Sequence, residues 1–228
     1  MRNWSLVALG LCAGLLAGPA HADSKPFAWI YDWYTPHKGE FELEAYADYN
    51  STGNTFTPQA ELEYGINNRL GVGAYLIGET GAHEGFNWHA AQVEARYRLG
   101  DFAYNRLLHT GYLEVNKENA SPVELEGKWL LSWYTRQHDV LAVNLIAEQK
   151  LGRHATEFQV AGGWARRFGP AAAGFETVLN LTEKQYHLGP TVTWNFTPET
   201  RLVANVSPGL TAASDRWLTR VVLRHEFF

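Results

Sequence analysis

A period-two alternation of apolar and polar residues runs through nearly the whole chain and is clearest in its last segment. Between residues 217 and 227, one face carries Trp217, Thr219, Val221, Leu223 and Phe227, and the other carries Leu218, Arg220, Val222, Arg224 and Glu226. Because successive side chains of a β-strand point to opposite faces, this segment is predicted to be a strand. Its apolar face suits lipid, whereas its two arginines and its glutamate need water or ionic partners.

The same alternation recurs often enough to predict about twelve strands. We place them at residues 40–49, 59–66, 70–76, 91–99, 109–115, 123–133, 141–147, 158–164, 173–181, 186–196, 202–206 and 217–227. Most are near the ~10 residues that cross a bilayer when tilted, and an even number lets both chain ends lie on the periplasmic side. The predicted fold is all-β, a closed antiparallel transmembrane β-barrel over residues 39–228. The pattern is weakest in the fifth, eighth and eleventh segments, so ten or fourteen strands also fit.

A soluble antiparallel sandwich is the alternative fold, because it would bury its apolar faces against each other. It accounts neither for the terminal Phe228 nor for the tryptophans near strand ends, at positions 88, 133, 164, 194 and 217. Aromatic residues make up 14% of the chain although its mean hydropathy is only −0.28. A barrel needs this combination, since aromatic girdles mark both membrane interfaces and half of each strand faces water. We therefore favour the barrel.

The first 22 residues have the features of a secretory signal peptide. Arg2 supplies the positive charge, residues 6–16 are apolar, and Ala20, His21 and Ala22 form a small-x-small cleavage site. A retained membrane anchor is the alternative, but the apolar run is shorter than the ~20 residues that a spanning helix needs. The only cysteine, Cys12, lies in this segment, so the mature chain is expected to lack disulfides and Cys-based metal sites. Residues 23–38 are expected to be a periplasmic lead-in.

If the apolar faces point to lipid, the opposite faces line the lumen with charged side chains. We place there Glu42, Glu44, Glu61, Glu63, Glu94, Arg96, Arg98, Glu124, Glu126, Lys128, Glu148, Glu176, Arg220 and Arg224. Because the first and last strands must pair to close the barrel, Arg220 and Arg224 should share a wall with Glu42 and Glu44. These charges form either a structural network that fills a narrow lumen or a selectivity lining for ions and small polar solutes.

A hydrolase embedded in the membrane is the main alternative from another functional class. It would need a serine nucleophile, a histidine and an acid within reach of one another. No recognisable lipid-hydrolase motif surrounds His187 or His225, so we expect no enzyme activity. The remaining histidines lack metal-ligand spacing, so no metal or cofactor is expected. The glycines at 71, 73 and 78 resemble a phosphate loop only superficially and fit a crowded inner wall better.

Three segments and the chain end carry a resemblance to a known family. They are FAWIYDWYTPHKGEFELEAY (27–46), ELEYGINNRLGVGAYL (61–76), YLEVNKENASPVELEGKWLLSW (112–133) and the terminal HEFF. Together they resemble an uncharacterised family of proteobacterial outer-membrane β-barrel proteins, over about the first half of the mature chain plus its end. The resemblance implies a barrel in the outer membrane and brings no substrate or catalytic residue. By resemblance to other barrels, Phe228 is expected to be an assembly signal for the barrel-insertion machinery.

The function expected from these observations is a narrow passive pore or facilitator for small polar solutes, in contact with outer-membrane lipid. Twelve strands enclose more space than an eight-stranded barrel filled by side chains. The expected outer loops, near residues 51–54, 79–85, 118–121 and 152–155, are too short for a plug or a large receptor surface. A closed structural barrel with a salt-bridged lumen is the opposing hypothesis. The acidic net charge of −5 argues against nucleic acid as a partner.

Overall fold

The computed structural model describes residues 25–81, 85–152 and 155–227. Most of these residues lie in twelve β-strands: β1 (Phe41–Asn50), β2 (Thr55–Gly65), β3 (Leu70–Glu79), β4 (Asn87–Leu99), β5 (Leu107–Glu118), β6 (Glu124–Tyr134), β7 (Asp139–Lys150), β8 (Thr156–Phe168), β9 (Ala171–Asn180), β10 (Gln185–Asn195), β11 (Thr200–Pro208) and β12 (Trp217–Phe227). Within this described part, no helix has the length and apolar character needed to span a membrane. The predicted signal peptide and Phe228 lie outside the described residues.

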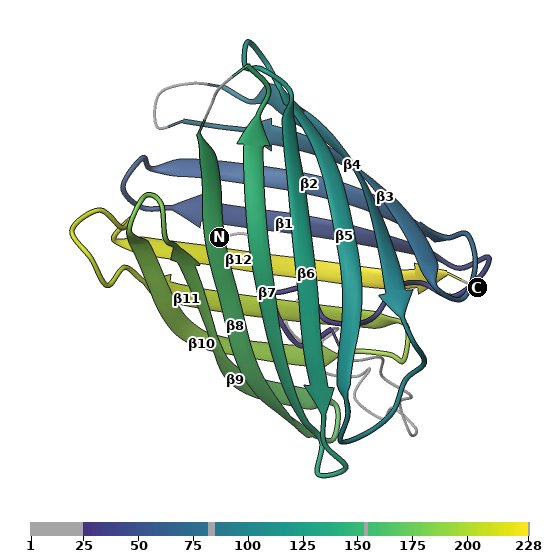
Figure 1. The fold of residues 1–228 in the computed structure, drawn as a ribbon. Helices are drawn as coiled ribbons and strands as arrows, with labels where there is room; N and C mark the ends of the chain where they lie inside the picture. Colours follow the sequence, from purple (N-terminus) through teal and green to yellow (C-terminus); the bar gives the residue numbers. More distant parts are fainter. Residues whose placement is uncertain (1–24, 82–84, 153–154, 228) are drawn as a thin grey trace, which may run out of the picture.

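The twelve strands form one closed antiparallel barrel, in which each strand pairs with its sequence neighbours and β12 pairs with β1 (Figure 1). The closing register sets Phe41 opposite Phe227 and Glu44 opposite Arg224. The predicted fold class and strand number are therefore confirmed. The three segments in which the alternation is weakest form the complete strands β5, β8 and β11. Each strand extends beyond its predicted limits, because backbone pairing continues where the side-chain alternation is less regular.

The outer face of the barrel is apolar and exposed. Leu113, with 70% of its surface accessible, and Val93, with 55%, are typical of it. The tryptophans at 88 and 217 lie at one end of this belt, and those at 133, 164 and 194 lie toward the other. An apolar band flanked by aromatic girdles is the surface that a transmembrane barrel presents to lipid.

Residues 25–36, hereafter the closing segment, lie inside the barrel, where Figure 1 shows them in dark purple. Phe27, Ile30 and Trp33 pack in one buried cluster with Ala142 and Ala161 of the wall. The expectation of a periplasmic lead-in over residues 23–38 did not include this position in the lumen. The physical reason is that three large apolar side chains gain more by burial against the small wall residues than by exposure to water.

Both ends of the closing segment lie toward one end of the barrel, with Lys25 beside Glu42 near the start of β1. His37, which follows it, lies against Gly65 at the end of β2, and Thr35 and Pro36 lie against Gly71 near the start of β3. This end, where β1 begins and β12 finishes, is called the terminal end. The opposite, loop end carries short connections, of which the longest spans residues 209–216.

Candidate functional site

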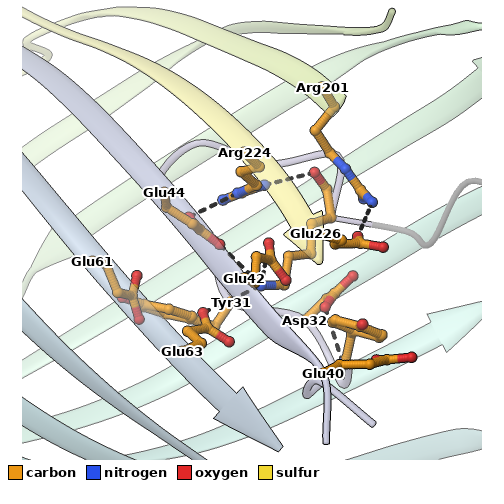
Figure 2. Close-up of polar contacts among 12 residues, drawn as sticks. Tyr31, Asp32, Glu40, Glu42, Glu44, Glu61, Glu63, Arg201, Arg224 and Glu226 are labelled. Atoms are coloured by element: carbon orange, nitrogen blue, oxygen red, sulfur yellow. Dashed lines mark hydrogen bonds and ion pairs between the residues drawn. The ribbon is translucent and has the colours of Figure 1, made fainter. Parts of the chain in front are cut away.

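Five glutamates from three strands converge on the lumen near the terminal end. The register sets Glu42 opposite Glu63 and Glu44 opposite Glu61, while Glu94 lies across from Gly73. All five are buried, with Glu42 only 1% exposed. Figure 2 shows the four glutamates of β1 and β2 close together. This group of Glu42, Glu44, Glu61, Glu63 and Glu94 is called the glutamate cluster.

Gly73 provides the room that the glutamate cluster occupies. A Cβ atom at this position would lie 2.9 Å from the Oε1 atom of Glu61 and 2.9 Å from the Cγ atom of Glu94. The wall between these two side chains must therefore lack a side chain of its own. The sequence analysis favoured a crowded inner wall over a phosphate loop at this glycine, and the contact agrees with that interpretation.

Three cations lie among the five carboxylates. The Nζ atom of Lys25 lies 2.9 Å from Glu42, 2.9 Å from Glu44 and 3.3 Å from Glu63. Arg96 lies 2.7 Å from Glu94 and also pairs with Glu63, and Arg224 lies 2.8 Å from Glu44. Two of these cations belong to the wall, whereas Lys25 is brought by the closing segment.

The Lys25 ammonium stays charged in this position. Burial by itself lowers its pKa, but the surrounding carboxylates of Glu42, Glu44 and Glu63 raise the pKa above the ordinary lysine value. The ring of Tyr34 lies 5.2 Å from the same Nζ atom, within the range of a cation–π contact. Lys25 is therefore held as a cation by the wall and by its own segment.

Tyrosine hydroxyls extend this polar network across the lumen. The Tyr46 hydroxyl lies 2.5 Å from Glu44 and 2.7 Å from Glu61. The Tyr75 hydroxyl donates to Glu94 at 2.9 Å and lies 2.8 Å from the hydroxyl of Tyr31. Buried polar groups need such partners, and these tyrosines add hydrogen bonds to carboxylates of the glutamate cluster.

The backbone of the closing segment is held by side chains of the opposite wall. The Asn144 side chain accepts a hydrogen bond from the Tyr31 amide at 2.9 Å and donates to the Tyr31 carbonyl at 2.7 Å. The Glu176 carboxylate accepts hydrogen bonds from the Ala28 and Trp29 amides at 2.8 and 2.7 Å. An extended segment without secondary structure thus has its polar groups paired inside the barrel.

Its carbonyl groups find further partners on other strands. Arg224 donates to the Lys25 and Phe27 carbonyls at 2.8 and 3.2 Å. Thr193 donates to the Pro26 carbonyl at 2.9 Å and Thr110 to the Trp33 carbonyl at 3.1 Å. Arg224 therefore joins the glutamate cluster to the closing segment, a link that Figure 2 shows beside Glu44.

The half of the lumen toward the loop end holds a second, less buried set of charges. Lys128 pairs with Glu126 at 2.7 Å and Lys150 with Glu124 at 3.2 Å. Glu148, opposite Glu126 in the register, is only partly buried. The closing segment reaches this set through Tyr31, whose ring lies 4.5 Å from the Lys128 Nζ atom.

The charged positions expected to line the lumen fall into three places. Five glutamates with Arg96 and Arg224 form the group near the terminal end, and Glu124, Glu126, Lys128 and Glu148 lie toward the loop end. The remaining three contact the closing segment: Glu176 through two amides, Arg98 over the Trp33 ring at 4.5 Å, and Arg220 over the Trp29 ring at 3.9 Å. Arg220 also pairs with Asp48, its register partner on β1.

Sequence reasoning missed Lys25, Asn144 and the Arg201–Glu226 pair. Asn144 and Arg201 stand on the polar side of their strands, so the alternation could have found them. Lys25 carries no such signal, because the closing segment has no period. His187, considered for a hydrolase, is buried, and its Nε2 atom lies 3.2 Å from the Asp215 carbonyl oxygen.

Comparison with known proteins bears on the fold. No protein-family model matches the sequence, and no curated protein does. Among solved structures, the KdgM porin has a TM-score of 0.65 at 9% identity, over 82% of this chain and 99% of that chain. The NanC porin has a TM-score of 0.61 at 12% identity, over 80% and 98%. An outer-membrane channel from Pseudomonas putida has a TM-score of 0.60 at 9% identity, over 90% and 100%.

At these identities the likeness shows the fold, which is that of outer-membrane porins and channels. The predicted outer-membrane location agrees with it, as does the apolar belt of the barrel. The fold does not identify a solute or a transport mechanism, because these depend on the side chains that line the lumen.

Proposed function

We propose that this protein is a passive outer-membrane pore for small polar solutes, closed from the periplasmic end by residues 25–36. The terminal end of the barrel is the periplasmic end in this proposal, since bacterial barrels keep both chain ends there. The similarity to porins supports a pore, and a solved KdgM porin is described in complex with disordered oligogalacturonate.

The observation that carries the proposal is the small size of the wall residues behind the closing segment. A Cβ atom at Gly163 would lie 2.7 Å from both Ile30 and Phe27, and Ala161 and Ala165 are buried in the same cluster. In small barrels, the side chains of the wall itself fill the interior. Here the wall residues at 161, 163 and 165 are small, and the space beside them is filled by residues 25–36, which precede β1 in the chain.

The opposing proposal, a closed structural barrel, is favoured by the number of contacts that hold the closing segment. Asn144, Glu176, Thr193 and Arg224 together pair most of its backbone between residues 25 and 31. If these contacts never break, solutes do not pass and the charges serve stability alone.

Planar-bilayer recordings separate the two proposals. The mature chain and a variant lacking residues 25–36 would be compared after each is shown to be folded by heat-modifiable migration on a gel. If the protein is a pore, the full chain should show brief or small channel openings, and the variant should show larger and longer-lasting current steps. If the deletion prevents folding, Asn144→Ala combined with Glu176→Gln loosens the segment instead. Silence from the full chain and from every variant that folds supports the closed barrel.

A further inference from the structure

We infer that the pore selects cations and that the Lys25 ammonium occupies its cation site as a tethered substitute for the solute. The inference rests on the proposed pore function and names the class of solute: small cations, including those with a primary ammonium group. It is carried by the geometry around Lys25 and by the charge of the wall without it.

The wall forms a cage for a cation that the wall itself does not supply. Carboxylate oxygens of Glu42, Glu44 and Glu63 lie within 3.3 Å of the Lys25 Nζ atom. An ammonium group has three N–H donors, so three carboxylates can satisfy it completely. Among the ion pairs of the described residues, Lys25 is the only partner of Glu42. The cage is therefore incomplete whenever the closing segment is elsewhere.

The glutamate cluster carries excess negative charge when Lys25 leaves. The five carboxylates of the cluster would then face two guanidinium groups, those of Arg96 and Arg224. Carboxylates that line a water-filled passage attract cations and repel anions. An open pore with this lining should therefore favour cations.

The site can accept more than one kind of cation. One carboxylate oxygen each from Glu44, Glu61 and Glu63 lies within 4.8 Å of the other two. An alkali ion or the ammonium end of a small amine therefore has carboxylate ligands at this place once Lys25 has moved.

The experiment measures reversal potentials in a potassium chloride gradient. The variants are the segment-deleted chain, full-length Lys25→Gln, and Lys25→Gln combined with Glu42→Gln, in which the two lost charges cancel. Glu183→Gln, at an exposed position in the loop between β9 and β10, is the matched control. Methylammonium chloride serves as the probe for competition at the cage.

We expect potassium to permeate better than chloride in the segment-deleted and Lys25→Gln proteins, with no change in the control. Adding Glu42→Gln should move the permeability ratio toward unity. Methylammonium should reduce the potassium current of Lys25→Gln at lower concentrations than it does for the double variant. Conducting pores without cation preference would overturn the inference and leave the pore intact. Absence of conductance from every folded variant would overturn the pore and the inference with it.

Discussion

At the scale of single residues, Asn144 is the side chain whose removal most directly loosens the closing segment. It makes both a donor and an acceptor contact with Tyr31, and each such hydrogen bond contributes roughly 0.5–1.5 kcal/mol. Asn144→Ala should therefore raise the open probability by about tenfold, because about 1.4 kcal/mol corresponds to a factor of ten. Asn116→Ala is the control, since Asn116 lies on the wall toward the loop end, 3.5 Å from Glu124. Equal open probabilities for the two variants in single-channel records would show that Asn144 does not hold the segment.

Two adjacent glycines of β8 give a second test at this scale. An added Cβ at Gly163 would meet Ile30 and Phe27 at 2.7 Å, whereas at Gly162, on the lipid side, its nearest neighbour would be 3.7 Å away. Gly163→Ala should displace the closing segment and increase conductance, and Gly162→Ala should leave it unchanged. Chymotrypsin cleavage after Phe27 in folded protein offers a second readout, which should be faster only in Gly163→Ala. Resistance equal to that of the unchanged protein would contradict the packing argument.

The sequence alone could place some residues of the lumen but not others. Alternation placed Glu42, Glu63 and Arg224 on the inner face, because strand geometry fixes the direction of each side chain. It could not place Lys25, whose partners are 17 to 38 positions away and whose segment has no regular structure. The contacts of such a segment depend on the shape of the cavity, which exists only once the barrel has closed.

At the scale of elements, β12 is the strand that closes the barrel, with Phe227 opposite Phe41. The sequence predicted this strand from its period-two alternation. It also predicted the pairing with β1, because a closed barrel must join its first and last strands. Deletion of Phe228 should lower the amount of inserted protein, since a terminal aromatic residue is expected to be recognised by the insertion machinery. Trp194→Ala, which removes one exposed girdle residue, should lower it less. Quantitative blots of outer-membrane fractions compare the two, and equal insertion of the deletion and the unchanged chain would refute the role of Phe228.

At the scale of the whole molecule, the barrel combines a lipid-facing belt, a charged lumen and a closing segment that belongs to one end of the chain. The lipid-facing belt and the charged lumen follow from the alternation and could be predicted. The position of the closing segment could not be predicted. The short outer loops suggested an unplugged lumen, and the segment that fills it precedes β1. In the proposed pore, the glutamate cluster that holds Lys25 connects closure to the charge of the solute.

The most direct test of this account is the single-channel conductance of the folded mature chain beside that of the variant lacking residues 25–36. The account predicts larger and longer-lasting steps when the segment is absent, because the small wall residues at 161, 163 and 165 then line an open passage. Two folded proteins with the same conductance, or none in either, would contradict it.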